Sequence, residues 1–435
     1  MYSELLKEKI ENKTATVGVV GLGYVGLPLS VEMAKAGFSV IGFDVQQKKV
    51  DMVNKGYNYI GDVIASDLDT IVKSGKLKAT GDYSLLKDCD CVSICVPTPL
   101  DKYQQPDISY VEASAKAVAK YAHAGMLVVL ESTTYPGTTE EVIQPLLEAK
   151  GLKVGSDVFL AFSPERVDPG NKQYKTKNTP KVVGGVTPDC TKLASLFYGT
   201  FIEGGVYSVS SPRVAEMEKI LENTFRNINI ALANEMAILC DRMDIPVWEV
   251  IDAAKTKPYG YMAFYPGPGL GGHCIPLDPF YLTWKARAYN YHTRLIEIAG
   301  EINNGMPEYI VERVSRMLNK AKKPLNGSTV FLLGVAYKPD IDDLRESPVL
   351  RIISLLEKAG AKVVCNDPYI PTFTVGGKEY HSTDIDRTSL AAADIAVVTT
   401  NHSCYDMNFI AKYSKAVFDT RGATTGITSE NVERL

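Results

Sequence analysis

Apolar residues near the start of the chain alternate between short β-branched runs and a helical pattern. Residues 15–20 form an apolar run that ends in glycines. Residues 27–36 then repeat apolar positions at helical spacing up to Gly37, and a second run covers 39–43 and ends at Asp44. An apolar run, a helical period and another apolar run together predict a β-α-β unit of a parallel sheet.

The same alternation continues to about residue 205. Further apolar runs predict strands at 91–97, 126–132, 158–162 and 181–186. The alanine-rich segment 110–124 has the composition of a helix and lies between two of these runs. We therefore expect residues 1–205 to form one α/β domain with a parallel sheet.

The middle of the chain has a different pattern. Residues 211–243 contain no glycine and a single proline, Pro212, near the start, where a helix tolerates it. Apolar residues recur there at helical spacing, namely Val214, Met217, Leu221, Phe225 and Ile228. The pattern predicts a helix of roughly thirty residues, whereas the mean in globular proteins is about eleven or twelve. Such a helix is long enough to join two domains and to present a face for dimerisation.

The last part of the chain repeats the outline of the first. A helix closed by Gly360 is expected at 348–359, and strands are expected at 330–335, 361–366, 394–399 and 416–419. We predict two doubly wound Rossmann-like α/β domains joined by a long central helix and a helical dimerisation region. The expected domains are residues 1–205, 206–315 and 316–435.

Composition and charge narrow the class of protein. The 435 residues are 45% hydrophobic and 23% charged, and the formal net charge is −4. An acidic balance gives no electrostatic reason to expect nucleic acid as a partner. The N-terminal residues lack the apolar core of a signal peptide, and no apolar stretch is long enough to span a membrane. We expect a cytoplasmic protein whose eight cysteines are reduced and, in most cases, buried.

A glycine-rich turn follows the first predicted strand. Residues 21–26 read GLGYVG, with the residues Gly21, Gly23, Tyr24, Val25 and Gly26 in the positions of a dinucleotide-binding turn. The glycines permit a tight turn and close approach of a pyrophosphate to free amides at a helix N-terminus. Asp44 ends the next strand, where a carboxylate accepts hydrogen bonds from ribose and repels a 2′-phosphate. NAD is therefore favoured over NADP. A strand–helix turn without a ligand is the alternative interpretation.

The segment 264–279, FYPGPGLGGHCIPLDP, contains the residues most suggestive of chemistry. Four glycines and two prolines within 266–272 predict an irregular backbone that lets a ligand come close. Cys274 follows, with Asp278 four residues later. A lone cysteine after glycines is more often structural, so the interpretation depends on the rest of the sequence.

Taken together, the motifs resemble the UDP-glucose/GDP-mannose dehydrogenase family over essentially the whole chain. The matching segments are GLGYVG (21–26), VPTP (96–99), TTYPG (133–137), SPER (163–166), EMEKILENTFRN (216–227), GGHCIPLDP (271–279) and YKPDIDDLRESP (337–348). Their order and spacing agree with the family, which makes the resemblance stronger than any single motif.

The resemblance implies a four-electron oxidation of the C6 hydroxyl of a UDP-sugar with two NAD molecules, for surface polysaccharide precursors. It assigns to Cys274 the nucleophile that forms a thiohemiacetal and then a thioester. Lys219 and Asn223 match the residues that stabilise the developing alkoxide. Asp278 matches the carboxylate that positions water and the lysine, and Glu165 the glutamate of thioester hydrolysis.

Several of these assignments have alternatives. Thr134 matches the threonine that holds a catalytic water, and the register to Pro136 favours it over Thr133. Lys219 and Asn223 could instead be ordinary residues on a solvated helix face. His273, beside the nucleophile, is interpreted as a loop-shaping residue. The remaining seven cysteines are expected to be packing residues.

The resemblance also implies binding residues outside the glycine turn. For NAD these are Lys49, Thr98, Thr134 and Arg345. For the UDP-sugar they are Glu165, Arg166, Lys219, Asn223, Lys338 and Arg421, with the loop residues Tyr265, Gly267, Gly269 and Gly271. Members that act on UDP-glucose have an arginine upstream of the loop that reaches across the dimer. This chain has KPYGYMAF at 257–264, which puts that contact in doubt.

The sugar is inferred from local resemblance. UDP-glucose members usually carry a lysine directly before the loop aspartate, and here the residue is Leu277. SPERVDPGN (163–171) and the cysteine loop look more like the N-acetylhexosamine branch. We expect UDP-N-acetylglucosamine as substrate, with UDP-N-acetylmannosamine as runner-up and UDP-glucose less favoured, and a homodimer or larger oligomer.

Two other classes of protein share parts of the pattern. A non-catalytic dinucleotide sensor would be free to lose at least one of Cys274, Lys219, Asn223 and Asp278, which are all present. A two-electron 3-hydroxyacid dehydrogenase shares the glycine turn and the lysine helix but requires neither the cysteine nor a second α/β domain. No metal is expected in the site.

Overall fold

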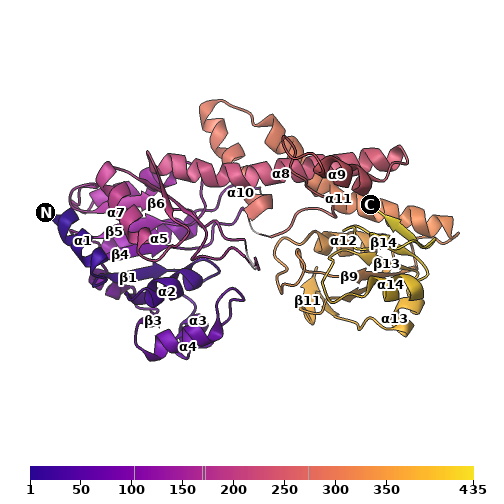
Figure 1. The fold of residues 1–435 in the computed structure, drawn as a ribbon, viewed down its shortest axis with the longest axis horizontal. Helices are drawn as coiled ribbons and strands as arrows, with labels where there is room; N and C mark the ends of the chain where they lie inside the picture. Colours follow the sequence, from indigo (N-terminus) through magenta and orange to yellow (C-terminus); the bar gives the residue numbers. More distant parts are fainter. Residues whose placement is uncertain (102, 169, 172, 273) are drawn as a thin grey trace. The chain divides into compact units, whose positions relative to one another are not determined.

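In the computed structural model, the described residues are 1–101, 103–168, 170–171, 173–272 and 274–435, and they form two compact units. The first unit comprises Met1–Glu222 and Phe280–Tyr291, and the second comprises Asn223–Pro279 and His292–Leu435. Two helices contribute residues to both units: α8 (Pro212–Arg242), which is unbroken in Figure 1, and α10 (Cys274–Ala286).

The first unit is built on an eight-stranded sheet. In order across the sheet the strands are β3 (Leu77–Thr80), β2 (Ser39–Phe43), β1 (Thr16–Val20), β4 (Cys91–Ile94), β5 (Leu127–Leu130), β6 (Phe159–Phe162), β7 (Lys181–Gly185) and β8 (Val206–Val209). Every neighbouring pair is parallel except β6 and β7, which are antiparallel. Strands β4, β5 and β6 are buried along their whole length, as expected for strands covered by helices on both faces.

Helices of the first unit connect these strands. They are α1 (Tyr2–Glu11), α2 (Gly26–Lys35), α3 (Gln47–Asn54), α4 (Ala65–Lys73), α5 (Ser109–Tyr121), α6 (Gln144–Glu148) and α7 (Pro188–Gly199). The strand order reverses between β1 and β4, so the loops that leave these two strands diverge. Such a switch point at the carboxyl edge of a doubly wound sheet is where ligands bind.

The second unit carries a smaller parallel sheet. Its strand order is β10 (Lys362–Asn366), β9 (Thr329–Leu333), β13 (Ile395–Val398), β14 (Val417–Asp419) and β15 (Val432–Arg434). A two-stranded hairpin, β11 (Thr372–Val375) with β12 (Lys378–His381), follows β10. The helices of this unit outside α8 and α10 are α9 (Val247–Lys255), α11 (Arg294–Lys320), α12 (Pro348–Lys358), α13 (Arg387–Ala392) and α14 (Met407–Tyr413).

The two faces of this sheet belong to different hydrophobic clusters. Val330 and Leu332 of β9 pack in a cluster that includes α11 and α12, whereas Phe331 and Leu333 pack in one that includes α13 and α14. Figure 1 shows the same layers, with α12 on one side of β9 and β13 and with α13 and α14 on the other. This two-faced burial is the alternation expected of a strand between two helical layers.

The predicted fold class is confirmed, with two Rossmann-like α/β sheets and a long central helix. The helix expected at 211–243 is α8, which has 31 residues. The expected strands of both sheets are present with ends shifted by up to three residues. Strands β3, β8 and β15 and the β11–β12 hairpin were not predicted. The division into three domains stays a prediction, because the described chain separates into two units.

The cysteines depart from expectation at one position. Six of the eight are buried, but Cys404, like Cys274, is exposed. The expectation that all seven other cysteines are packing residues is therefore wrong for Cys404, which lies in the loop between β13 and α14. No helix among the described residues is both long enough and apolar enough to cross a membrane.

Candidate active site

The glycine turn leaves space above its second glycine. Gly21 follows β1 with a φ of 94°, and a Cβ there would lie 2.5 Å from the carbonyl oxygen of Cys95. A Cβ on Gly26 would meet the carbonyl oxygen of Gly21 at 1.8 Å, whereas one on Gly23 would meet no atom within 4 Å. The first and third glycines are thus required by packing, and Gly23 faces open space of the kind a pyrophosphate needs.

Asp44 lies beside this turn with capacity left to accept hydrogen bonds. Its Oδ2 accepts from the backbone N–H of Leu22 at 3.0 Å, and its Oδ1 accepts from that of Gln46 at 2.8 Å. Lys49 Nζ is 3.7 Å from Oδ2. Each carboxylate oxygen therefore has one backbone donor and further lone pairs, an arrangement that fits the ribose of NAD.

The other expected cofactor residues of the first unit lie near the same edge of the sheet. Tyr24 is exposed in the turn, and Val25 is the N-cap residue that precedes α2. Thr98, after β4, is buried, and its carbonyl oxygen accepts a hydrogen bond from Tyr281 Oη at 2.6 Å. The hydrogen bond from Tyr281 fixes the backbone at Thr98, the residue expected to contact the cofactor.

Thr134 and Glu165 follow β5 and β6 and carry acceptor oxygens without donors. Thr134 is fully buried, and its Oγ1 has no hydrogen-bond partner among the described residues. Glu165 Oε1 accepts from the N–H groups of Arg166 at 2.7 Å and Val167 at 2.9 Å, and Oε2 has no donor at hydrogen-bond distance. Buried oxygens of this kind are usually satisfied, so both mark places for a ligand or water.

Glu165 is held as a carboxylate. Burial alone would raise its pKa, but the ammonium of Lys181 and the two backbone N–H groups outweigh burial and lower the pKa below its ordinary value. Glu165 Oε2 lies 3.5 Å from Lys181 Nζ. A charged carboxylate with an unfilled oxygen is suited to take a proton.

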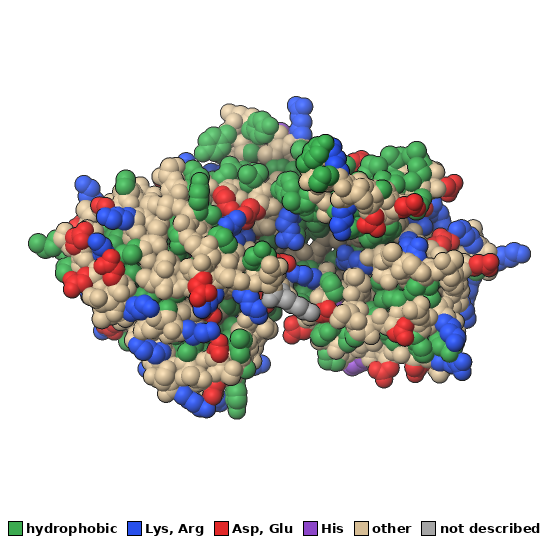
Figure 2. All heavy atoms as spheres, in the orientation of Figure 1, with side chains coloured by type: hydrophobic (Ala, Val, Ile, Leu, Met, Phe, Trp, Pro, Cys, Tyr) green, Lys and Arg blue, Asp and Glu red, His purple; other side chains and the backbone are tan. Residues whose placement is uncertain are grey.

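Helix α8 buries polar residues and exposes apolar ones. The buried positions include Glu216, Lys219, Asn223, Asn227 and Asn234, each at most 6% exposed. The exposed positions are Val214, Met217, Leu221, Phe225, Leu232, Leu239 and Met243. Figure 2 shows hydrophobic side chains on the surface where the second half of α8 lies. The alternative that Lys219 and Asn223 belong to a solvated face is therefore wrong.

Lys219 is a buried cation without an ion pair in its own unit. It is 6% exposed, and its ammonium forms no hydrogen bond or ion pair with the described residues of the first unit. A desolvated, unpaired charge is costly, so an ammonium in this position is suited to an oxyanion supplied by a ligand.

Arg166 is tied to α8 by two glutamates. Its guanidinium forms ion pairs with Glu222 and with Glu218, and it donates to the carbonyl oxygen of Pro180 at 3.0 Å. Burial and the neighbouring Glu222 raise the pKa of Glu218 to about 7. The expected contact of Arg166 with substrate stays a prediction, and it would have to coexist with these ion pairs.

Cys274 is the first residue of a helix rather than part of a loop. Helix α10 begins at Cys274, and the thiol is exposed. The irregular backbone predicted at 266–272 ends before Cys274, and Pro276 and Pro279 lie inside the helix. A helix N-terminus favours an anion, which suits a thiolate. The neighbouring His273 lies outside the described residues.

Three asparagines of α8 hold the segment that carries Cys274. Asn223 Nδ2 donates to Asp278 Oδ2 at 2.6 Å, and Asn227 Nδ2 donates to the carbonyl oxygen of Ile275 at 3.1 Å. Asn234 Oδ1 accepts from the N–H of Gly267 at 2.9 Å. Asp278 is 2% exposed. The loop and the first turn of α10 are therefore attached to α8 by buried hydrogen bonds at three points.

Asn303 of α11 completes this network. Its Nδ2 donates to the carbonyl oxygen of Asn227 at 3.1 Å, and its Oδ1 accepts from Asn234 Nδ2 at 2.9 Å. Asn303 is 2% exposed. Buried amides joined in this way fix one another's orientation and make the network rigid.

The glycines of the loop are required by packing inside the second unit. A Cβ on Gly267 would lie 2.7 Å from Arg421 Nη1, and one on Gly271 would lie 2.4 Å from Tyr337 Cβ. Gly269 has a φ of 128°. Tyr265, just before them, stacks on Trp248 and donates to Asp252 Oδ1 at 2.9 Å. Packing alone therefore explains why these loop positions are glycines, so the glycines do not by themselves indicate a bound ligand.

Arg421 is a desolvated cation beneath this loop. Its Nε donates to the carbonyl oxygen of Thr399 at 2.9 Å, and none of the ion pairs among described residues includes it. Burial, partly opposed by Asp419, lowers the pKa of Arg421 to about 10. A half-buried guanidinium without a carboxylate partner is suited to an anion such as a diphosphate.

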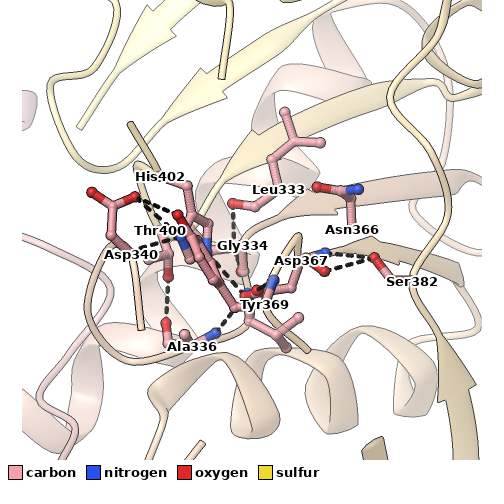
Figure 3. Close-up of polar contacts among 12 residues, drawn as sticks. Leu333, Gly334, Ala336, Asp340, Asn366, Asp367, Tyr369, Ser382, Thr400 and His402 are labelled. Atoms are coloured by element: carbon pink, nitrogen blue, oxygen red, sulfur yellow. Dashed lines mark hydrogen bonds and ion pairs between the residues drawn. The ribbon is translucent and has the colours of Figure 1, made fainter. Parts of the chain in front are cut away.

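A hydrogen-bond network shown in Figure 3 shapes the loop after β9, which carries Lys338. Asp367 Oδ2 accepts from the N–H groups of Val335 at 2.7 Å and Ala336 at 2.9 Å. His402 Nε2 lies 3.0 Å from the same oxygen, and the N–H of Asp340 donates to His402 Nδ1 at 3.0 Å. Because Nδ1 accepts from Asp340, Nε2 is the nitrogen that donates to Asp367.

The loop's two expected binding residues are placed within the second unit. Lys338 is half-buried beside Tyr337. Arg345 forms a close pair with Asp343, with Nη2 at 2.7 Å and Nε at 3.0 Å from the carboxylate. The approach of Arg345 to NAD stays a prediction.

Sequence reasoning missed several residues that build these clusters. Lys181, Asn234, Asn303 and His402 lie in segments interpreted only as helix, strand or loop, and Asn227 ends the motif 216–227 but was given no role. For two of them the sequence did carry a signal, because Asn227 and Asn234 are polar residues seven apart on a helix whose apolar positions lie on the other face. The other three are brought to their sites by the fold.

Comparison with known proteins matches the chain to one family over most of its length. Three models of the UDP-glucose/GDP-mannose dehydrogenase family match: the NAD binding domain at residues 15–202, the central domain at 213–305 and the UDP binding domain at 331–426. The chain is 37% identical over 392 residues to a UDP-N-acetyl-D-glucosamine 6-dehydrogenase of Pseudomonas aeruginosa, covering 90% of this chain and 91% of that one.

Other relatives act on a different sugar. The chain is 36% identical to a UDP-N-acetyl-D-mannosamine dehydrogenase of Escherichia coli, covering 94% of this chain and 99% of that one. Among solved structures, a UDP-N-acetyl-D-mannosamine dehydrogenase from Pyrococcus horikoshii superposes with a TM-score of 0.88 at 33% identity, covering 96% of this chain and 98% of that one. The identities to proteins with different sugars are therefore too similar to identify the sugar.

Proposed function

The chain belongs to the UDP-glucose/GDP-mannose dehydrogenase family, and from that premise we propose that it oxidises C6 of UDP-N-acetylglucosamine to a carboxylate through a thioester on Cys274. The family makes it an NAD-dependent UDP-sugar dehydrogenase. The observation that carries the thioester is the exposed thiol of Cys274 at the start of α10, held by the buried Asn223–Asp278 and Asn227–Ile275 hydrogen bonds.

NAD accepts a hydride from C6 in each of the two oxidations. Gly23 leaves room for its pyrophosphate, Asp44 retains lone pairs for ribose hydroxyls, and Lys49 lies beside that carboxylate. A 2′-phosphate would meet the charge of Asp44, which favours NAD over NADP.

Lys219 and Asn223 act on the C6 oxygen. In the alcohol, the hydroxyl proton passes to a bound water as charge develops on oxygen and the hydride passes to NAD, and a buried ammonium stabilises that charge strongly. Asn223, one helical turn later, adds an amide donor whose orientation is fixed by its bond to Asp278. The unpaired burial of Lys219 in its own unit supports this role.

Cys274 captures the aldehyde. Its thiolate adds to C6, forming a C–S bond and an alkoxide that takes up a proton to give a thiohemiacetal. Transfer of the C6 hydride to a second NAD and of the hydroxyl proton to water then leaves a thioester. Sulfur suits both steps, since a thiolate is a strong nucleophile and also a good leaving group.

Glu165 serves the hydrolytic step. A water oxygen adds to the thioester carbon while Glu165 takes a proton from that water, and the C–S bond then breaks to return the thiolate. The unfilled Oε2 of Glu165 supports this role, and the unpartnered Oγ1 of Thr134 supports its role in holding water.

We assign binding of the nucleotide and the sugar to basic residues of the second unit and to its glycine-containing loop. Arg421 and Lys338 supply charge for the diphosphate, and the backbone of residues 265–271 supplies hydrogen bonds. UDP-N-acetylglucosamine is proposed because Leu277 replaces the lysine of UDP-glucose members and because of the Pseudomonas relative. UDP-N-acetylmannosamine is the second candidate, favoured by the Escherichia coli relative.

We also propose that the chain assembles into a homodimer or larger oligomer. The apolar residues on the outer face of α8 support this proposal, since a stripe of exposed leucine, methionine and phenylalanine is typical of an interface.

A panel assay tests the substrate. Purified protein and NAD would be mixed in turn with UDP-N-acetylglucosamine, UDP-N-acetylmannosamine and UDP-glucose, and NADH and acid would be quantified. We expect two NADH per acid formed and the largest kcat/KM with UDP-N-acetylglucosamine. A larger value for either other sugar would overturn the sugar assignment, and one NADH per product would overturn the four-electron route.

A further inference from the structure

A buried ion pair lies beside Glu165 and has no part in the reaction described above. Lys181 and Glu131 have side chains that are 3% and 0% exposed, and Lys181 Nζ lies 2.6 Å from Glu131 Oε2. The hydroxyl of Tyr198 donates to the other oxygen of Glu131 at 2.5 Å. Lys181 also donates to the carbonyl oxygen of Pro164, the residue before Glu165, at 3.1 Å.

The sheet topology brings these residues together. Glu131 directly follows β5, and Glu165 lies three residues after β6, so both are at the carboxyl edge of the parallel strands. Lys181 is the first residue of β7, and β7 runs antiparallel to β6. The start of an antiparallel strand lies at the same edge as the ends of its parallel neighbours, and this places a strand-initial lysine beside two strand-terminal glutamates.

One ammonium therefore serves two buried carboxylates. Lys181 Nζ is 2.6 Å from Glu131 and 3.5 Å from Glu165 Oε2, the oxygen that has no hydrogen-bond donor. Glu131 is paired with Lys181 and accepts a hydrogen bond from Tyr198. The same Lys181 ammonium also attracts the carboxylate of Glu165. Two carboxylates near one another cannot both stay charged in a buried setting without such a cation.

From this geometry we propose that Lys181 is a positioning residue for thioester hydrolysis, which holds the carboxylate of Glu165 charged and fixes the backbone at Pro164. The inference rests on the proposed function, because it assumes that Glu165 takes the proton of the hydrolytic water. Lys181 itself does not contact the reacting atoms in this assignment.

Other charged or titratable groups around Glu165 do not replace Lys181. The groups that face this cluster from neighbouring elements are Cys95 after β4, Glu131 after β5, Tyr198 on α7 and Lys219 on α8. The adjoining Arg166 also attracts Glu165, but its guanidinium is paired with Glu222 and Glu218. Burial raises the pKa values of Cys95 and Tyr198, so both stay neutral. Lys219 has a weaker effect on Glu165 than Lys181 does. Removal of Lys181 would therefore leave Glu131 and Glu165 to compete for a proton.

The test is the pH dependence of thioester hydrolysis. Protein, NAD and UDP-N-acetylglucosamine would be mixed and quenched at intervals between about pH 3 and 9, a range that includes the low pKa of the wild-type Glu165, and the adduct on Cys274 would be followed by mass spectrometry. In the wild type, hydrolysis is lost as pH falls and Glu165 takes up a proton. In Lys181→Met this acid limb should move upward by about 1–3 pH units, the range for loss of a close opposite charge.

Matched variants separate charge from structure. Lys181→Arg keeps the cation and should return the acid limb to within about half a unit of wild type. Glu131→Gln removes the competing carboxylate, so the limb should stay or move to lower pH. The burst of NADH from the first oxidation should be unchanged in all three variants, because that step does not use Glu165.

Each possible outcome either supports or overturns the role of Lys181. A limb that is unmoved in Lys181→Met, with hydrolysis slowed equally at every pH, would overturn the assignment and leave Lys181 a purely structural residue. If Lys181→Met does not fold, an upward shift in Glu131→Gln would overturn it instead. Absence of any adduct or NADH in the wild type with this sugar and with UDP-N-acetylmannosamine would refute the proposed function, a result distinct from an active enzyme with an unmoved limb.

Discussion

Asn227 donates its side-chain N–H to the carbonyl oxygen of Ile275 at 3.1 Å, in the first turn of α10. In a regular helix that carbonyl would accept from the N–H of residue 279, but residue 279 is a proline and has none. Asn227 therefore takes the place of a missing helical hydrogen bond one residue from Cys274. The substitution of a side chain for a backbone donor explains how a helix with an internal proline can begin at the nucleophile.

Asn227→Leu should weaken the first turn of α10. A buried carbonyl would lose its donor, at a cost of about 1–3 kcal/mol in the free energy of unfolding. Because Cys274 depends on that turn, kcat should fall about tenfold or more while the KM for NAD changes little. The control is Asn229→Leu, whose side chain bonds only to the carbonyl of Phe225 within α8. Equal kcat in the two variants would show that the turn does not need Asn227.

Replacing Cys274 separates the thioester route from simple alcohol oxidation. Cys274→Ser should lose nearly all formation of acid, because a serine hydroxyl is far harder to ionise than a thiol. Cys274→Ala should still bind NAD and UDP-sugar. Cys404→Ser is the matched control, since Cys404 is the other exposed cysteine. Wild-type acid formation by Cys274→Ala, measured by mass spectrometry of the product, would refute the mechanism.

Cofactor preference depends on Asp44. The wild type should use NAD with a kcat/KM at least tenfold above that for NADP, because the carboxylate repels a 2′-phosphate. Asp44→Asn should narrow this ratio, mainly through a higher KM for NAD. It should also destabilise the turn slightly, since Asp44 accepts from Leu22 and Gln46. Steady-state kinetics with NAD and with NADP give the ratio of the two kcat/KM values. Comparable wild-type kcat/KM values for the two cofactors would contradict the role assigned to Asp44.

Titration of Glu218 should make the stability of the protein depend on pH. Burial and the charge of Glu222 raise its pKa to about 7, above the ordinary value of 4.5. A raised carboxyl pKa means that stability is lost as pH rises from 4.5 through 7, because the folded protein must then hold an unfavourable charge. Glu218→Gln should therefore be neutral near pH 4.5 and stabilise the protein by about 1–3 kcal/mol at pH 8.

Thermal denaturation at the two pH values measures this difference. The control is Glu235→Gln, an exposed glutamate on the same helix. If Glu218→Gln changes the melting temperature equally at both pH values, Glu218 does not titrate in this range.

The oligomer should depend on the apolar stripe of α8. Leu232→Glu and Leu239→Glu place charges at positions that are 54% and 45% exposed in the single chain, so neither should disturb its core. We expect light scattering to give a dimer or larger species for the wild type and a monomer for the double variant. Leu5→Glu, at an exposed leucine of α1, is the control. A wild-type monomer with full activity would contradict the proposal.

Much of the fold could be predicted because the buried strands are short apolar runs bounded by glycine and polar residues. Strands β1, β4 and β9 are of this kind, and each was expected at its observed place. The missed strands β3 and β8 are at the edges of the first sheet, where polar residues such as Lys78 and Ser208 alternate with apolar ones. Their pattern is too short and too polar to distinguish them from loops.

The functional residues could be predicted only where they lie in a recognisable sequence motif. The glycine turn could be recognised from its own residues, whereas Cys274 and Asp278 were assigned through the resemblance of several motifs to one family. Lys181 could not, because it begins an apolar run, and nothing in a linear pattern tells that β7 runs antiparallel to β6. Burial of Lys219 and Asn223 was also hidden, since the apolar positions of α8 suggested the opposite face as the inner one.

Asp44 and Asp367 follow the second strand of their respective sheets, yet only one offers a starting point for redesign. Asp44 has one backbone donor on each oxygen, so changes around it can alter cofactor choice. On Asp367, Oδ2 already accepts from the N–H groups of Val335 and Ala336 and from His402, and Oδ1 accepts from the N–H of Tyr369. An engineer who wished to build a second dinucleotide site in the C-terminal sheet would have to free Oδ2 by replacing the histidine and rebuilding the loop after β9.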